Sequence, residues 1–311
     1  MASPRLPRPG GGARNAPETL TGTLPLTRKP AIAMIPYYLK LQGDLRDVPL
    51  DDLDWPIGRP DGLRGTIGDL GPGDHLYSFP RFWMYGRQVR RLRAKMSLMI
   101  VEPSSFHGHH MVLARLFHRR FHRVLSCNQR LLAAIPNGQH FVFGDTWVHD
   151  WRSRDATKTR MLSLIASKRR QLRGHRLRHS VVRRLRAEGI EADIMGGAYK
   201  PFEDKADGLA PYRYSLVIEN SREPGYFTEK IIDAFLLNTV PIYWGAPDIG
   251  RYFDTDGIII CNSEEALVSA AAACSQADYD ARAAAIAANR KAAIPYLNVV
   301  KSAARVIEAT L

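Results

Sequence analysis

The chain has 311 residues, 45% of them hydrophobic, which is enough for about two domains with ordinary cores. The net charge of +13 at pH 7 favours polyanionic partners such as nucleic acid, anionic lipid head groups or phosphorylated small molecules. Because no apolar stretch approaches the roughly 20 residues that span a bilayer, the composition favours a soluble protein, attached at most to a membrane surface.

The cysteine pattern and the N-terminal segment indicate the cellular compartment. Cys127, Cys261 and Cys274 are odd in number and lack metal-type spacing, so we expect a reduced, cytoplasmic chain without disulfides. Residues 1–30 are rich in Pro, Gly and Arg and have no apolar core, which predicts a disordered leader rather than a signal peptide.

Strands and helices are expected to alternate in the first half of the chain. Residues 44–74, rich in Asp, Gly and Pro, are predicted to be a loop. The alternation predicts βα units, a parallel sheet and a first domain over residues 31–155. The expected elements are an apolar run at 31–38, strands at 97–101, 123–126 and 140–143, and helices at 108–120 and 129–134.

A second alternating set predicts a second domain over residues 156–294, with a separate C-terminal helix at 295–311. Two Rossmann-like, doubly wound α/β domains facing a cleft are therefore the expected architecture. The Ala-rich stretch from 264 to 293 is helical by propensity. The other expected elements are strands at 161–166, 190–194, 214–219, 240–244 and 257–261, and helices at 174–188 and 228–237.

The segment 212–253 is the most informative part of the sequence. Its apolar strand ends in Glu219-Asn220, and after a short loop a helix begins at Thr228-Glu229-Lys230. Open α/β sheets bind ligands at such strand ends. A helix N-terminus with free N–H groups and a neighbouring lysine favours a phosphate.

A basic run, from Lys168 to Arg186, supplies much of the positive charge. A solvated helix face accounts for such a run as readily as phosphate recognition does. A nucleic-acid-binding module is a further alternative, but the run lacks the interleaved aromatic residues of single-strand binders. We therefore expect no nucleic-acid partner. Attraction of the basic residues to anionic lipids makes peripheral contact with the inner face of the membrane an alternative.

The segment 219–241 closely resembles the signature of the α1,3/α1,4-fucosyltransferases, glycosyltransferase family 10, and most of all that of its bacterial members. Weaker resemblance extends upstream through Ser167-Lys168, Gly174-His175 and Gly196-Gly197. Departures are Lys168, where many members have Asn, and Gly225, where animal members often have Asp. The residues that carry the resemblance are Glu219-Asn220-Ser221, Tyr226, Thr228-Glu229-Lys230, Ala234-Phe235 and Thr239-Val240-Pro241.

The resemblance implies a GT-B-type fold with an N-terminal acceptor domain and a C-terminal GDP-fucose domain. It implies inverting transfer of L-fucose from GDP-fucose, without an obligatory metal, to O3 of GlcNAc or Glc. The acceptor implied is an oligosaccharide or lipid-linked glycan in lipopolysaccharide or other surface-glycan synthesis. A glycosyltransferase of the same fold that uses another nucleotide sugar remains an alternative.

The resemblance also implies a role for individual residues. The phosphate-contacting arginine of the family falls on Arg178, and its nucleotide-site residues fall on Tyr226, Glu229 and Lys230. Its strand-end motif falls on Glu219 and Asn220, and its catalytic base falls on Glu102.

The chemistry of these residue types agrees with those roles. Arg178 and Lys230 suit the developing charge of a leaving pyrophosphate, although Lys230 is alternatively a surface residue paired with Asp233. Glu229 either holds sugar hydroxyls or complements the helix dipole. Glu219 either faces the ligand or pairs with an arginine, because a buried, unpaired carboxylate is costly. Glu102 follows a buried strand. It is either a general base for the acceptor hydroxyl or a solvated residue at the strand end.

Two patterns that resemble metal sites are interpreted otherwise. The histidines at 107, 109, 110, 118 and 122 have no carboxylate or cysteine beside them, so we expect them to line the acceptor cleft or the surface. Asp254-Thr255-Asp256 precedes a glycine and indicates a turn. Tyr243 and Trp244 lie in a strand and are expected in the core.

Overall fold

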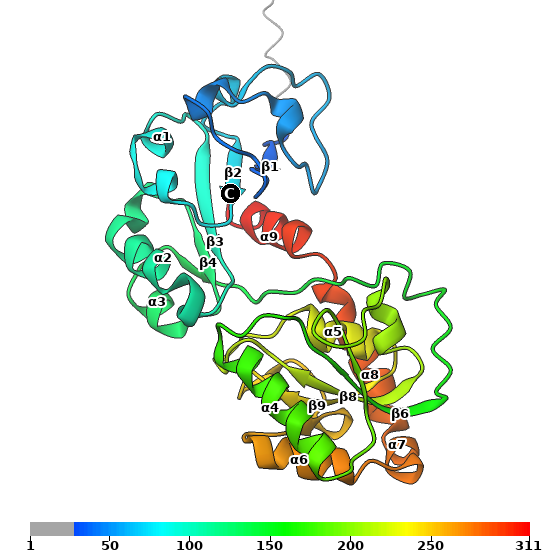
Figure 1. Ribbon diagram of the computed structural model, residues 1–311. Coiled ribbons are helices and arrows are strands. Elements are labelled where there is room, and N and C mark those ends of the chain that lie inside the picture. The colour runs from blue at the N-terminus through cyan, green and yellow to red at the C-terminus, as the bar shows by residue number, and fades with distance from the viewer. Residues whose placement is uncertain (1–27) are drawn as a thin grey trace, which may run out of the picture.

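The computed structural model describes residues 28–311 as two α/β lobes (Figure 1). Within these residues each lobe is built on a parallel sheet of five strands. The leader predicted for residues 1–30 lies outside the described residues, apart from its last three positions. The two-lobed α/β fold class predicted from the sequence is confirmed.

The N-terminal sheet has its strands in the same order as the chain. Successive parallel strands always step in the same direction, so right-handed crossovers keep the connecting helices on one face. The opposite face of the sheet therefore needs a cover from elsewhere in the chain. The strands are β1 (Ile32–Met34), β2 (His75–Ser78), β3 (Lys95–Ile100), β4 (Val124–Ser126) and β5 (Gly138–His140).

Alternate side chains of β3 divide the apolar residues between the two faces of this sheet, as a strand period of two requires. Leu98 and Ile100 join the core beneath the connecting helices, whereas Met99, and Val101 directly after the strand, join a separate core on the opposite face. The helices on the first face are α1 (Arg87–Arg90), α2 (Ser104–Phe117) and α3 (Gln129–Ala133).

The C-terminal sheet has the order β10-β9-β8-β6-β7. The chain runs outward from β6 to β7, returns to β8 on the other side of β6, and continues to β10. The doubly wound order places a switch point between β6 and β8, where such folds bind ligands. The strands are β6 (Arg160–Ile165), β7 (Asp193–Met195), β8 (Tyr212–Ile218), β9 (Val240–Trp244) and β10 (Ile259–Ile260).

Helices cover both faces of the C-terminal sheet. Leu216 and Ile218 of β8 pack beneath α4 and α6, whereas Val217 packs on the opposite face beneath α5 and α8. Burial on both faces explains the continuous apolar sequence of β8 and β9. The helices are α4 (Arg173–Ala187), α5 (Glu229–Leu236), α6 (Glu264–Ala272), α7 (Gln276–Ala281) and α8 (Ala283–Ala293).

The last helix, α9 (Val299–Glu308), returns to the N-terminal lobe and covers the open face of its sheet (Figure 1). Ala303, Ala304 and Ile307 are fully buried there, and the Tyr77 hydroxyl donates a hydrogen bond to the Val300 carbonyl at 2.7 Å. The chain thus passes between the lobes twice, after β5 and before α9.

The two passages touch each other. Asp145 and Asn298 form an antiparallel bridge between them. A Cβ on Gly144 would lie 2.5 Å from the Tyr296 Cβ, a distance that real side chains do not reach. Gly144 therefore permits the two strands of the connection to pass in contact.

Most predicted elements are present, and the differences have local causes. The strand predicted at 240–244 is confirmed, whereas the strand predicted at 140–143 lies at Gly138–His140. The Ala-rich stretch is three helices rather than one, because Ser275 caps the start of α7 and Arg282 lies between α7 and α8. β2 was not predicted from the sequence.

The structure also describes the state of the cysteines and the lengths of the helices. All three cysteines are free thiols, and burial raises their pKa, to about 12 at Cys127 and Cys274 and to about 11 at Cys261. Over residues 28–311, the helices are too short or too polar to cross a bilayer.

Candidate active site

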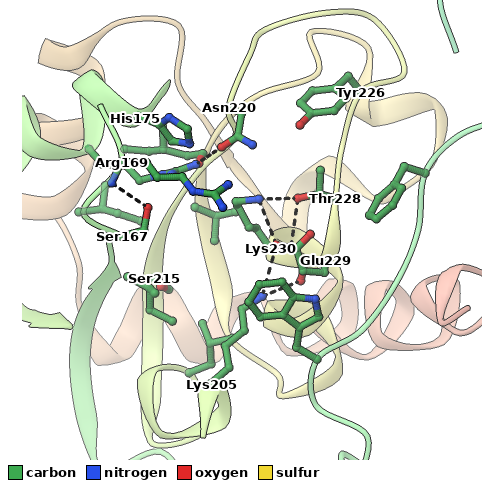
Figure 2. A pocket seen from close by; sticks show the side chains of 18 of the residues that line it. Ser167, Arg169, His175, Lys205, Ser215, Asn220, Tyr226, Thr228, Glu229 and Lys230 are labelled. Carbon is green, nitrogen blue, oxygen red and sulfur yellow. Dashed lines mark hydrogen bonds and ion pairs between the residues drawn. The ribbon is translucent and has the colours of Figure 1, made fainter. Parts of the chain in front are cut away.

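A cavity of about 460 Å³ lies between the lobes, where β3 and β8 end (Figure 2). The N-terminal lobe contributes Val101 and Glu102, and the connecting segment contributes Phe143 and Trp147. The C-terminal lobe lines the rest of the cavity with Ser167, Arg169, His175, Arg178, Lys205, Asn220, Tyr226, Thr228, Glu229 and Lys230, among others. Six of the seven site residues predicted from the sequence line this cavity, and Glu219 lies behind it.

Arg178 is held at the end of β8 by a backbone acceptor. Its Nε donates to the Ile218 carbonyl at 2.9 Å, and its Nη2 donates to the same oxygen and to Asn220 Oδ1 at 2.9 Å. Burial lowers the pKa of Arg178, against the neighbouring carboxylates, but an arginine stays charged at neutral pH. Asn220 therefore orients the guanidinium, and both residues face the cavity.

Close packing of α4 on β8 makes this geometry possible. The Gly174 N–H donates to the Asn220 carbonyl at 3.1 Å. A Cβ on Gly174 would lie 1.7 Å from the Glu219 carbonyl oxygen, so only glycine permits the approach.

Glu219 is fully buried and serves the first turn of α5. Its Oε1 accepts the Thr228 N–H at 2.9 Å, and its Oε2 accepts the Thr228 hydroxyl at 2.8 Å and lies 3.5 Å from Lys230 Nζ. The sequence left two roles open for Glu219, contact with the ligand and pairing with an arginine. The structure shows neither of them. Glu219 positions Thr228 and Lys230.

Lys230 lies at the N-terminus of α5, and its side chain is 24% exposed toward the cavity. Its Nζ donates to Thr228 Oγ1 at 2.9 Å and to Glu229 Oε1 at 3.1 Å. Burial lowers the pKa of Lys230, but the Glu219 and Glu229 carboxylates outweigh it and the pKa is raised. The lysine therefore stays charged, and its position is fixed by these acceptors.

Glu229 lies between two lysines. Burial raises its pKa, but Lys230 and Lys205 outweigh that effect and lower the pKa to about 2. Lys205, in a short turn before β8, donates to Asp233 Oδ2 at 2.7 Å. The alternative pairing of Lys230 with Asp233 is therefore wrong, because Lys205, Thr146 and the Trp147 N–H occupy that buried carboxylate.

Tyr226 is 1% exposed, and its hydroxyl has no hydrogen-bond partner within residues 28–311. An unpartnered buried hydroxyl is costly. Figure 2 shows the hydroxyl directed toward the cavity, on the side of Asn220 and Lys230. Tyr226 therefore offers a hydrogen bond that a bound ligand can complete.

Glu102 is the carboxylate that the N-terminal lobe brings to the cavity. It is half-buried, directly after β3, and no hydrogen bond or salt bridge engages its side chain within the described residues. Burial raises its pKa, and Glu229 and Glu219 act in the same direction against Lys230. A carboxylate with a raised pKa and free oxygens can accept a proton near neutral pH.

Two further residues of the cavity were missed as site residues. His175 is buried, and burial together with Arg178, Arg169 and Lys230 lowers its pKa to about 4, so the ring is neutral at pH 7. Arg169 is exposed and lines the cavity. Both belong to the segment 167–178, and its basic composition was the sequence feature that could have indicated that they line the site.

The patterns that resemble metal sites are accounted for by packing. Asp254 caps a turn through the Asp256 N–H, and Tyr243 and Trp244 are buried, so both predictions are confirmed. His109 stacks on Phe82, and His110 packs against Tyr85. Within residues 28–311, no group of three His, Cys, Asp or Glu side chains is arranged to hold a metal ion.

A polar contact joins the lobes beside Glu102. The Glu223 carboxylate accepts the Ser104 N–H at 3.0 Å and the Ser104 hydroxyl at 3.0 Å. Pro103 gives α2 no side-chain cap, so a carboxylate from the C-terminal lobe caps this helix instead. We call this contact the Glu223–Ser104 clasp.

Two Rossmann-like lobes, with a charged cavity between their strand ends, define a GT-B-type protein. Residues 155–264 match the family model "Glycosyltransferase family 10 (fucosyltransferase) C-term". Residues 155–264 thus match the C-terminal domain of glycosyltransferase family 10, and the resemblance predicted from the sequence is confirmed over these residues.

Curated relatives match a shorter segment. The chain is 40% identical over 57 residues to Alpha-(1,3)-fucosyltransferase FucT of Helicobacter pylori, which is 18% of this chain and 12% of that protein. It is 32% identical over 62 residues to Alpha-(1,3)-fucosyltransferase B of Drosophila melanogaster, 20% of this chain and 14% of that protein. The matches therefore span only a small part of the relatives.

Solved structures cover more of the chain at lower identity. A crystal structure of an alpha1,3-fucosyltransferase aligns with a TM-score of 0.47 and 18% identity, covering 76% of each chain. A structure of an alpha1,3-fucosyltransferase with GDP-fucose aligns with a TM-score of 0.45 and 18% identity, covering 71% of this chain and 72% of that chain.

Proposed function

We propose that the protein transfers L-fucose from GDP-fucose to a hydroxyl of a glycan. One observation carries the proposal: Glu102 from one lobe and Arg178 with Lys230 from the other line the same cavity. The family 10 domain and the names of the matched relatives support fucose as the sugar and position 3 as the site of transfer, and O3 of GlcNAc or Glc is the proposed acceptor position. A surface glycan such as lipopolysaccharide is the proposed context.

The donor half of the mechanism rests on fixed positive charge. Arg178, Lys230 and the N-terminus of α5 would hold the pyrophosphate and stabilise the charge that develops on GDP as it leaves. Because these groups are already held by Ile218, Asn220, Thr228 and Glu219, little reorganisation is needed. They supply this charge without an obligatory metal, and Tyr226 and Glu229 would contact the nucleotide sugar.

The transfer half rests on Glu102. Its carboxylate accepts the proton of the acceptor hydroxyl as the oxygen forms a bond to C1 of fucose. The bond between C1 and the β-phosphate oxygen breaks, and GDP leaves with the electron pair through an oxocarbenium-like transition state. Attack on the face opposite GDP inverts the configuration at C1.

Glu102→Gln tests the assignment of the base. The variant should bind GDP as the wild type does and lose transfer by about 100-fold or more, since general-base catalysis contributes about 100- to 10,000-fold. Retained transfer activity would remove Glu102 from the mechanism.

Thermal stabilisation by nucleotides tests the donor. GDP and GDP-fucose at about 100 times their dissociation constants should each add about 2.7 kcal/mol, whereas UDP and UDP-glucose should add none. Stabilisation by GDP-mannose but not by GDP-fucose would overturn the choice of sugar. No response to any of these nucleotides would overturn the proposed function.

A further inference from the structure

A second cavity, of about 430 Å³, adjoins the first one. The two share Glu102, Arg169, His175 and Asn220 as lining residues. Figure 2 shows Arg169, His175 and Asn220 on the same side of the first cavity. Glu102 therefore borders both cavities, where a general base would need to be if the donor filled the first cavity and the acceptor the second.

The remaining lining of the second cavity suits a sugar. Phe106 is 56% exposed and offers an apolar plate, and Gln171 offers an amide. A concave site with an aromatic surface and a few hydrogen-bonding groups is typical for small polar ligands. Phe106 comes from α2, whose N-terminus the Glu223–Ser104 clasp fixes, so both lobes contribute to this cavity.

Exposed cations lie along the segment 168–176, which contributes Arg169, Gln171, Leu172 and His175 to the second cavity. Lys168, Arg169, Arg170, Arg173 and Arg176 are all exposed, and none forms a salt bridge within residues 28–311. The sequence offers them no local partner, because no acidic residue occurs between Asp155 and Glu188. Cations that have no internal counter-charge are available to a ligand.

Main-chain contacts hold the Arg176 guanidinium and the Arg169 backbone beside the cavity. Arg176 Nη1 donates to the Gln171 carbonyl at 2.7 Å, which fixes the guanidinium against the loop that lines the cavity. The Arg169 carbonyl lies 3.2 Å from His179 Nε2, and Arg169 itself is a lining residue. The positive charge therefore lies at the wall and the loop of this cavity.

We propose that the second cavity binds the acceptor sugar, and that Arg169 and Arg176 recognise an anionic group on that acceptor. This inference rests on the proposed function, and it narrows the acceptor to glycans with a carboxylate or a phosphate next to the sugar that receives fucose. A carboxylate or phosphate that accepts hydrogen bonds from a guanidinium is bound more strongly than a neutral acceptor group. An anionic glycan therefore gains affinity that a neutral glycan lacks.

Binding of matched sugars to the GDP-loaded protein tests the inference without relying on turnover. The probes are N-acetyllactosamine and its 3′-sialyl derivative, and N-acetylglucosamine and its 1-phosphate. Calorimetry should show about tenfold tighter binding of at least one anionic probe than of its neutral counterpart, with an advantage that shrinks as salt is added. Equal affinity for neutral and anionic sugars in both pairs would overturn the inference.

Charge-removing variants locate the effect. Arg169→Gln and Arg176→Gln should each remove most of the anionic preference, whereas Arg183→Gln, an exposed arginine farther along α4, should keep it. Loss of the preference in Arg183→Gln to the same degree would mean a diffuse field and overturn the inference. So would an Arg169→Gln variant that loses GDP affinity but keeps the sugar preference.

Two further measurements distinguish a glycan ligand from a membrane surface, and a carboxylate from a phosphate. Vesicles with equal amounts of phosphatidylcholine and phosphatidylglycerol should not compete with the anionic sugar, and competition without any sugar preference would assign the cations to a membrane surface instead. The preference for 3′-sialyl-N-acetyllactosamine or for N-acetylglucosamine 1-phosphate distinguishes a glycan carboxylate from a carrier phosphate. GDP binding is measured separately, so its absence refutes the proposed function rather than this inference.

Discussion

Gly174→Ala is a sensitive test of how the donor site is built. Gly174 lies in the first turn of α4, where its backbone touches the end of β8. An added Cβ would lie 1.7 Å from the Glu219 carbonyl oxygen and 3.0 Å from the Asn220 Cα. The obstacle is backbone, so no side chain can rotate away to make room.

The displacement that follows can be worked out from these distances. Real Cβ contacts stay beyond about 3.0 Å, so the start of α4 and the end of β8 must separate by about 1.3 Å, the difference between 3.0 and 1.7 Å. The 2.9 Å bond from Arg178 to the Ile218 carbonyl would then approach about 4.2 Å and break. Overpacking of this kind costs about 1–3 kcal/mol of stability. Loss of a positioned charged contact to phosphate costs about 1.5–3 kcal/mol of GDP binding.

Urea denaturation and calorimetric titration with GDP measure the two effects separately. The expected result is a stability loss in that range and GDP binding weaker by about tenfold to 100-fold. Gly108→Ala, inside α2, is the matched control, because its Cβ meets nothing within 4 Å. It should leave GDP affinity unchanged and stability unchanged or about 1 kcal/mol higher. Wild-type GDP affinity in a folded Gly174→Ala protein would show that the position of Arg178 does not depend on this packing.

The remaining predictions concern other parts of the site and the fold. Glu219→Gln removes one of the two buried carboxylates beside Lys230, leaving Glu229, and should cost about 1.5–3 kcal/mol in urea denaturation, whereas Glu265→Gln on the surface should cost less than about 1 kcal/mol. Because burial raises the pKa of Glu102, the carboxylate becomes protonated at a higher pH than an ordinary glutamate; kcat should fall with decreasing pH from above the usual glutamate range, and a flat acidic limb would contradict a base role. Glu223→Gln weakens the cap of α2 and should lower kcat/KM for the acceptor without changing GDP affinity, so equal losses in both would contradict the clasp. Ile307→Ala in α9 should cost about 2–5 kcal/mol, while Arg305→Ala on its exposed side should cost little by the same denaturation assay.

Local sequence predicted the C-terminal lobe well because its elements are long, apolar and clearly bounded. The strand at 240–244 and the helix beginning at Thr228 follow from buried runs and a capping residue. The positions of Arg178, Asn220, Tyr226 and Lys230 around one cavity follow from the family signature, since spacing alone gives no cavity.

The N-terminal lobe was predicted less well for an identifiable reason. β2 contains His75 and Ser78, which read as polar but are buried through hydrogen bonds to Ser97 and to the Ile35 carbonyl. No local sequence pattern indicates hydrogen-bond partners that lie far away along the chain. The same limit hid Lys205, whose importance comes from Asp233 and Glu229, residues that only tertiary folding brings near it.

The double passage of the chain between the lobes has a mechanical consequence. With a single linker, one lobe can twist, slide or swing relative to the other. Here the two passages bridge at Asp145 and Asn298 and touch at Gly144 and Tyr296, so they act as one pivot that resists twisting. We therefore expect any opening of the cavity to be a swing about that pivot, during which the Glu223–Ser104 clasp must break. Such a swing would return the base on one lobe and the cations on the other to the same alignment whenever the clasp forms again.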